Sequence, residues 1–126
     1  MNVKALTRPT ELRGCRVRLT AGPAAAAEAR RQVQAAIRTW DILVDPDVAV
    51  LLTSDLVTNA IRHQAGGTLT LNIRWARGRL LVEVLGTTAD AEAWPGLILI
   101  AALSDDWGSY RTPWGRATYF TLAFTA

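Results

Sequence analysis

Apolar and polar residues alternate along several stretches of the chain, a period of two that is typical of half-buried β-strands. The first stretch sets the apolar Cys15, Val17 and Leu19 against Arg16 and Arg18, so one face of this strand is expected to be basic. The alternation predicts strands at residues 15–19, 68–76, 79–85 and 117–123. A further short strand is predicted at residues 107–111, before the last turn.

Another stretch, residues 24–40, repeats its apolar residues at intervals of three and four, as amphipathic helices do. The repeat runs through Ala29, Val33 and Ile37 without an internal Gly or Pro. This stretch is therefore predicted to be the first helix of the fold.

A second helix is expected to begin at Asp45-Pro46, because the aspartate can cap free N–H groups and proline suits the first helical turn. It should end near His63, just before a glycine turn. Residues 97–103 predict a third, short helix. Its sequence is so apolar on all sides that we expect it to pack against a sheet.

The order of these elements, β-α-α-β-β-α-β-β, predicts an α/β (α+β) sandwich in which helices back one face of a mixed β-sheet. A tight turn at Arg77-Gly78 joins the second and third strands into a β-hairpin. The chain has 126 residues, enough for one domain with a real core. Residues 1–14 are interpreted as a lead-in and residues 15–126 as the domain.

The net charge of +3 comes almost entirely from scattered arginines, since Lys4 is the only lysine. No run of basic residues is interleaved with aromatics, so nucleic acid is not the expected partner. DNA binding through a basic sheet face with Arg16, Arg18 and Arg74 is the last-ranked hypothesis, because these arginines can simply solvate an open face.

The longest apolar run, residues 97–103, is far shorter than the ~20 residues that a membrane-spanning helix needs. The N-terminus has no apolar signal-peptide centre, which predicts a soluble, cytoplasmic protein. Cys15 is the only cysteine and is expected to be a small buried hydrophobe. One histidine gives no cluster at metal-ligand spacing.

Asp55, Asn59 and His63 follow one another at intervals of four, which places them on one face of the second helix. A carboxylate one turn from an amide can accept a proton or hold a water, while the amide oxygen coordinates Mg²⁺. In the alternative interpretation the pair lies at the edge of the buried stripe and satisfies loop backbone groups. His63 is expected to interact with the helix C-terminus and has no assigned catalytic role.

Residues 54–63 read Ser-Asp-Leu-Val-Thr-Asn-Ala-Ile-Arg-His. This string resembles the N-box of actinobacterial anti-sigma-factor serine/threonine kinases, small histidine-kinase-like ATPase domains of the GHKL type, in which Ser-Glu-Leu-Val-Thr-Asn-Ala-hydrophobic-Arg-His is typical. The closing Trp107-Gly108 and Gly115-Arg116 are similar to the family's last hairpin, so the resemblance extends over most of the chain. It implies the GHKL (Bergerat) fold, with ATP and Mg²⁺ held beside the N-box helix.

Carried over position by position, the resemblance places Asp55 where the family has its general-base glutamate and Asn59 where it has its Mg²⁺ ligand. Gly96 falls on the second glycine motif, and Arg116 and Thr118 fall near the phosphates. These residues are the candidate catalytic and cofactor-binding set.

The sequence departs from the family in three places around this one pocket. At residues 85–87 it has Leu-Gly-Thr where the family has an aspartate that reads the adenine amino group. The lid is short, and its end carries Trp94 and Pro95 ahead of Gly96, although proline donates no N–H to a phosphate. The change from glutamate to Asp55 shortens the acid by one methylene, and catalysis is sensitive to errors of ~1 Å.

Two functional hypotheses follow from this comparison. The first is an anti-sigma-factor-like regulator of transcription that binds a sigma factor or an anti-anti-sigma protein, with ATP binding weak or lost; this hypothesis favours a degenerate kinase-like domain over an enzyme but leaves enzymatic activity open. The second is an active ATP-dependent serine/threonine kinase of the anti-sigma family that uses Asp55 and Asn59. Trp94 is a candidate partner contact, and homodimerisation is consistent with the family.

Overall fold

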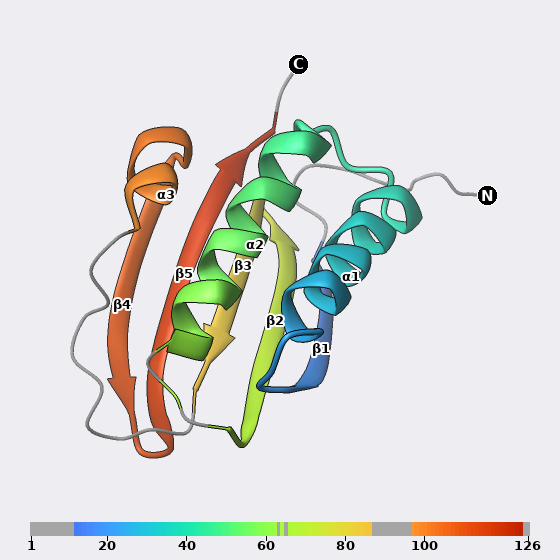
Figure 1. Ribbon diagram of the computed structural model, residues 1–126. Coiled ribbons are helices and arrows are strands. Elements are labelled where there is room, and N and C mark those ends of the chain that lie inside the picture. Colours follow the sequence, from blue (N-terminus) through green and yellow to red (C-terminus); the bar gives the residue numbers. More distant parts are fainter. Residues whose placement is uncertain (1–11, 63, 65, 87–96, 125–126) are drawn as a thin grey trace.

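The computed structural model describes residues 12–62, 64, 66–86 and 97–124 (Figure 1). Within them, the elements follow the order expected from the sequence. They are β1 (Arg13–Thr20), α1 (Ala25–Thr39), α2 (Pro46–Arg62), β2 (Thr68–Ala76), β3 (Arg79–Leu85), α3 (Ile98–Leu103), β4 (Asp106–Thr112) and β5 (Gly115–Ala123).

The described strands form one five-stranded sheet in the order β1-β2-β3-β5-β4. Every neighbouring pair is antiparallel, so the expectation of a mixed sheet was wrong. The reason lies in the connections. Two successive helices, α1 and α2, separate β1 from β2 and return the chain in the opposite direction. The single helix α3 connects β3 to β4, which would make these two strands parallel neighbours if they were adjacent. In the sheet, however, β5 lies between β3 and β4.

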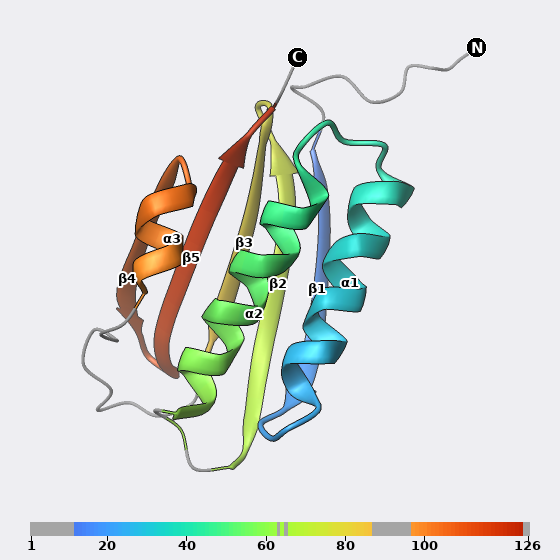
Figure 2. The same cartoon turned by 45° about the horizontal axis from the view of Figure 1, so that its top comes forward.

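Helices α1, α2 and α3 lie on the same face of the sheet, and no helix of the described residues covers the other face, called the open face below (Figure 2). Helix α1 contacts β1 and β2, helix α2 contacts β3 and β5, and helix α3 contacts β4. The core fills the space between these two layers. Its largest fully buried side chains include Trp75, Phe120, Leu52, Leu56 and Ile73.

Local sequence signals explain the start of α2 and the β2–β3 turn. The Asp45 carboxylate accepts hydrogen bonds from the N–H groups of Asp47 at 3.0 Å and Val48 at 3.3 Å, which confirms the expected cap. Arg77 and Gly78 both have positive φ, 53° and 75°, the conformation that a two-residue hairpin turn requires.

The short helix α3 is more exposed than its sequence predicts. Ile100 is fully buried, but Ile98 is 76% exposed and Leu99 and Leu103 are also exposed. The expected packing against the sheet is confirmed by the contact with β4, but it buries only one side of the helix. Helix α3 contacts β4, which is an edge strand of the sheet, so the sheet ends beside it (Figure 1). In the described ranges, no helix is long and apolar enough to cross a membrane.

Candidate functional site

Asp55 and Asn59 lie one turn apart on α2, as the sequence predicts. The Asn59 side chain is only 2% exposed, and its Nδ2 donates a hydrogen bond to the main-chain oxygen of Asp55 at 3.3 Å. Its Oδ1 and the Oδ2 of Asp55 are both buried and have no hydrogen-bond partner in the described part of the chain. Two oxygen acceptors one helical turn apart are thus held out of water and left unused.

The electrostatics of Asp55 follow from this burial. Loss of solvent raises the pKa of its carboxyl above the usual range, and the Arg62 guanidinium partly opposes that shift. A carboxylate with a raised pKa is a stronger proton acceptor than an exposed one, which is the property a general base needs. The same burial makes the charged form costly in the unliganded protein.

The two predicted phosphate-side residues lie on β5. Thr118 is fully buried and lies two residues before the core residue Phe120 on the same face of β5, so its side chain faces the helix layer. Its Oγ1 is 3.1 Å from the Oγ of Ser109, which lies directly opposite on β4. The Arg116 guanidinium donates to the same Ser109 oxygen at 3.0 Å. Helix α2 contacts β5 and lies over it in Figure 1.

Ser109 is a member of this group that the sequence analysis missed. The signal was available, because a hairpin centred on residues 113–114 pairs position 109 with position 118. Without the hairpin register, an isolated serine in a polar strand carries no information about its neighbours.

The end of β3 is closely packed around a glycine. Gly86 is buried there, and its N–H donates to the Arg116 main-chain oxygen at 3.0 Å. A Cβ built on Gly86 would lie 2.7 Å from Oε1 of Gln64. The Gln64 amide is itself buried and donates to the oxygens of Gly66 and Thr68. A side chain at position 86 therefore has no space unless Gln64 moves.

Several predicted residues lie outside the described residues, namely His63, Trp94, Pro95 and Gly96. Cys15 packs against the core but is only half-buried, whereas the sequence predicted a buried side chain. Among the residues that the structure describes, no three His, Cys, Asp or Glu side chains gather as a metal-binding group.

Comparison with known proteins gives a likeness in structure. No model of a known protein family matches this chain, and no curated protein sequence does. Thirteen chains of solved structures are similar to it. One is the crystal structure of the RsbU and RsbW domains of Rv1364c from Mycobacterium tuberculosis, with a TM-score of 0.72 and 18% sequence identity. The match covers 89% of this chain and 32% of that one. At this identity the likeness shows a shared fold.

Proposed function

We propose that this chain is an anti-sigma-factor-like regulatory protein that controls transcription by binding a sigma factor or an anti-anti-sigma protein. Nucleotide binding is weak or lost, and contact with the partner carries the regulation. The resemblance of residues 54–63 to the N-box supports this proposal. The fold shared with a chain that contains RsbU and RsbW domains is consistent with it.

One observation carries the proposal, namely the contrast between the two ends of the candidate site. On α2, the unpartnered oxygens of Asp55 and Asn59 are of the kind that Mg²⁺ and its waters prefer. At the end of β3, Gly86 offers no side-chain acceptor for an adenine amino group, and Gln64 occupies the adjacent space. The oxygens on α2 therefore suit Mg²⁺, whereas the end of β3 does not suit an adenine ring.

The roles of the chain's own residues follow from these positions. Bound Mg²⁺ and ATP would supply a phosphoryl group whose charge the metal neutralises. The Asn59 Oδ1 would hold the metal, and the Asp55 carboxylate would orient a water or accept the proton of a serine hydroxyl. Arg116 and Thr118 would lie on the phosphate side, where Ser109 fixes their orientation.

A thermal-shift titration with ATP and Mg²⁺ tests the nucleotide half of the proposal. A ligand at 100 times its dissociation constant stabilises a protein by ~2.7 kcal/mol, which a melting curve detects easily. We expect no shift at millimolar ATP. A shift that Asn59→Ala removes and the open-face variant Asn72→Ala retains would overturn the claim of weak or lost binding.

Capture from the native host tests the partner half. The tagged protein is expected to retain a sigma factor or an anti-anti-sigma protein, identified by mass spectrometry and then re-tested as a purified pair. Retention of neither protein, by a chain shown to be folded, would contradict the proposed function.

The second candidate function is an active serine/threonine kinase of the same family. It is favoured by the raised pKa of Asp55, which suits a general base. The measurement is transfer of the γ-phosphate to a serine of a purified anti-anti-sigma protein. Activity that Asp55→Ala abolishes would establish this function in place of the first.

A further inference from the structure

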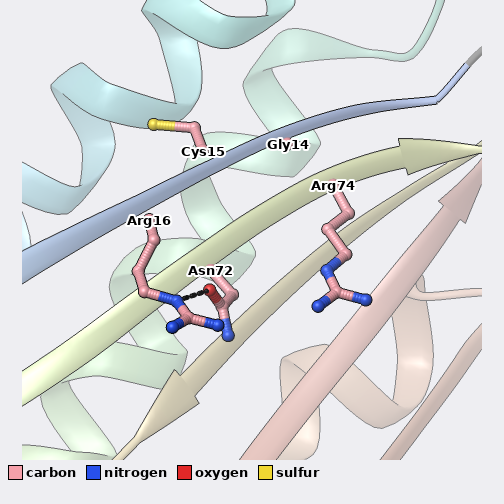
Figure 3. Close-up of a pocket in the computed structure, with 5 residues that line it drawn as sticks. All are labelled: Gly14, Cys15, Arg16, Asn72 and Arg74. Carbon is pink, nitrogen blue, oxygen red and sulfur yellow. Dashed lines mark hydrogen bonds between the residues drawn. The ribbon is translucent and has the colours of Figure 1, made fainter.

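The open face of the sheet carries a row of arginines at its β1 side. Arg16 and Arg18 project from β1, and Arg74 projects from β2 on the same face. Figure 3 shows Arg16 and Arg74 on this face with Asn72 between them, while Cys15 points to the other side. Three cations thus lie on neighbouring positions of two paired strands.

Two adjoining hollows follow this row along β1 and β2 and share Arg16 and Asn72; together they are called the trough. The first has a volume of about 260 Å³ and is lined by Gly14, Cys15, Arg16, Asn72 and Arg74. The second has a volume of about 370 Å³ and is lined by Arg16, Arg18, Thr70, Asn72, Leu85 and Trp114. The trough therefore combines positive charge with an apolar end at Leu85 and Trp114, whose side chain is 70% exposed.

The nearby acid Glu83 forms no ion pair with these arginines in the described part of the chain. The Nε of Arg16 donates to Asn72 Oδ1 at 3.1 Å, and Asn72 Nδ2 donates to Glu83 Oε1 at 3.1 Å. The other oxygen of Glu83 accepts the hydroxyl of Tyr110. Within the described ranges, Arg18 has no hydrogen-bond or ion-pair partner, and its guanidinium remains available to a ligand.

The strand that carries these arginines is also an edge of the sheet. Among the described strands, β1 has β2 as its single neighbour, so its other side presents backbone N–H and C=O groups. A peptide can pair with such an edge, and its alternate side chains then point to the same face as Arg16 and Arg18. Alternate residues along a strand are ~6.6 Å apart, so acids at every second position would match the two arginines.

We propose that the β1 edge and its arginine trough bind an extended acidic segment of a protein partner by strand addition. Acidic residues at alternate positions of that segment face Arg16 and Arg18. The inference goes beyond the proposed function, because it uses neither α2 nor the nucleotide side of the sheet.

Two other occupants fit the surface less well. A second copy of this chain, paired edge to edge through β1, would bring two rows of arginines together, and like charges on neighbouring strands are unfavourable. A nucleic acid would satisfy the arginines but has no peptide groups with which to pair the strand edge. An acidic peptide uses both the charge and the edge.

The test is fluorescence anisotropy of a labelled ten-residue peptide that alternates glutamate and valine, titrated with the full-length protein. A scrambled peptide of the same composition controls for net charge and should bind more weakly. Arg18→Glu should weaken binding about threefold to tenfold, since it replaces an attraction with a repulsion. The matched control Arg38→Glu changes another exposed arginine on α1 and should leave binding unchanged. Equal losses in both variants would overturn the proposal.

A glycine pair gives a second, independent contrast. A Cβ added at Gly14 or at Gly22 meets nothing within 4 Å, so both positions accept glutamate without a clash. Gly14→Glu places an acid in the trough and should abolish peptide binding, whereas Gly22→Glu lies outside it and should not. Circular dichroism confirms that each variant is folded.

Two peptides N-methylated on alternate sets of residues test strand addition itself. In one peptide the methyl groups replace the N–H groups that face β1, and this peptide should not bind. In the other peptide the methyl groups point away from β1, and this peptide should still bind. Equal affinity of the two methylated peptides would rule out pairing at the edge. An oligothymidine of the same length that binds more tightly than the peptide, with the same Arg18 dependence, would replace the proposed occupant with nucleic acid.

Discussion

Replacement of Asp55 by alanine is expected to stabilise the unliganded protein. The Oδ2 of Asp55 is buried without a partner, and no hydrogen bond in the described part of the chain depends on its side chain. The bond from Asn59 goes to the main-chain oxygen of residue 55 and is retained in the variant. Asp55→Ala therefore removes a desolvated acceptor and leaves its surroundings in place.

The magnitude follows from two contributions. An unsatisfied buried polar atom costs ~1–3 kcal/mol, and the lower end applies because Asp55 is only partly buried. Alanine also has a higher helix propensity than aspartate, which adds roughly 0.5 kcal/mol in the interior of α2. We expect a total of about 1.5 kcal/mol, or roughly 5 °C in melting temperature for a domain of this size.

The sign of the pH dependence provides a second check. Because burial raises the pKa of Asp55 in the folded protein, the folded state binds more protons than the unfolded chain between the two pKa values. The wild type is therefore penalised at neutral pH and recovers as the pH falls through the folded pKa toward the ordinary value of 3.8. The advantage of Asp55→Ala should be largest near pH 7 and should narrow near pH 4.

Urea unfolding followed by circular dichroism at both pH values measures these differences. Thr58→Ala, a half-buried position on the same helix with a similar propensity change, is the matched control and should gain only about 0.5 kcal/mol at either pH. If Asp55→Ala is no more stable than Thr58→Ala, the Asp55 carboxylate is not a desolvated group without a partner. The same conclusion follows if the difference in unfolding free energy between Asp55→Ala and the wild type is equal at pH 4 and pH 7.

Two further outcomes follow from local contacts. Asp45→Ala should destabilise the protein by about 1 kcal/mol in urea unfolding, because the N–H groups of Asp47 and Val48 lose their cap. A conservative Asp45→Asn should restore most of this loss. Burial, reinforced by the hydrogen bond to Glu83, raises the pKa of Tyr110 to about 12, so ultraviolet titration should show one tyrosine ionising late. In Glu83→Gln the same tyrosine should ionise at lower pH, and an unchanged titration would contradict the assigned contact.

The sequence predicted the elements well because each has a strong local signal. The alternation in residues 68–76 and 79–85 with Arg77-Gly78 between them placed the hairpin correctly. The Asp45-Pro46 pair placed the start of α2. What local signals do not contain is strand order. The insertion of β5 between β3 and β4 depends on pairing between distant residues, and the antiparallel sheet follows from it.

The same distinction applies to the candidate site. The spacing of Asp55 and Asn59 predicted that they share a helix face, but helical periodicity alone leaves both of their oxygens free to bond to loop groups. The structure shows instead that neither oxygen has such a partner in the described residues. The sequence analysis missed Gln64 because its contact with Gly86 joins residues that are far apart along the chain. Only the folded structure shows that its side chain fills the space beside Gly86.

The buried oxygens of Asp55 and Asn59 also bear on which function the chain performs. A buried acceptor that lacks a partner costs free energy, so folding alone does not account for these two oxygens. A role in binding does account for them, whether the ligand is a metal ion, a water held for a partner, or a partner's own donor group. The arginine trough lies on the opposite face of the sheet, so variants of α2 and variants of β1 can be combined. If both surfaces bind one partner protein, α2 variants and β1 variants should each weaken its affinity, and their effects should add because the sites are far apart. If the two surfaces bind unrelated ligands, each set of variants should weaken only its own ligand.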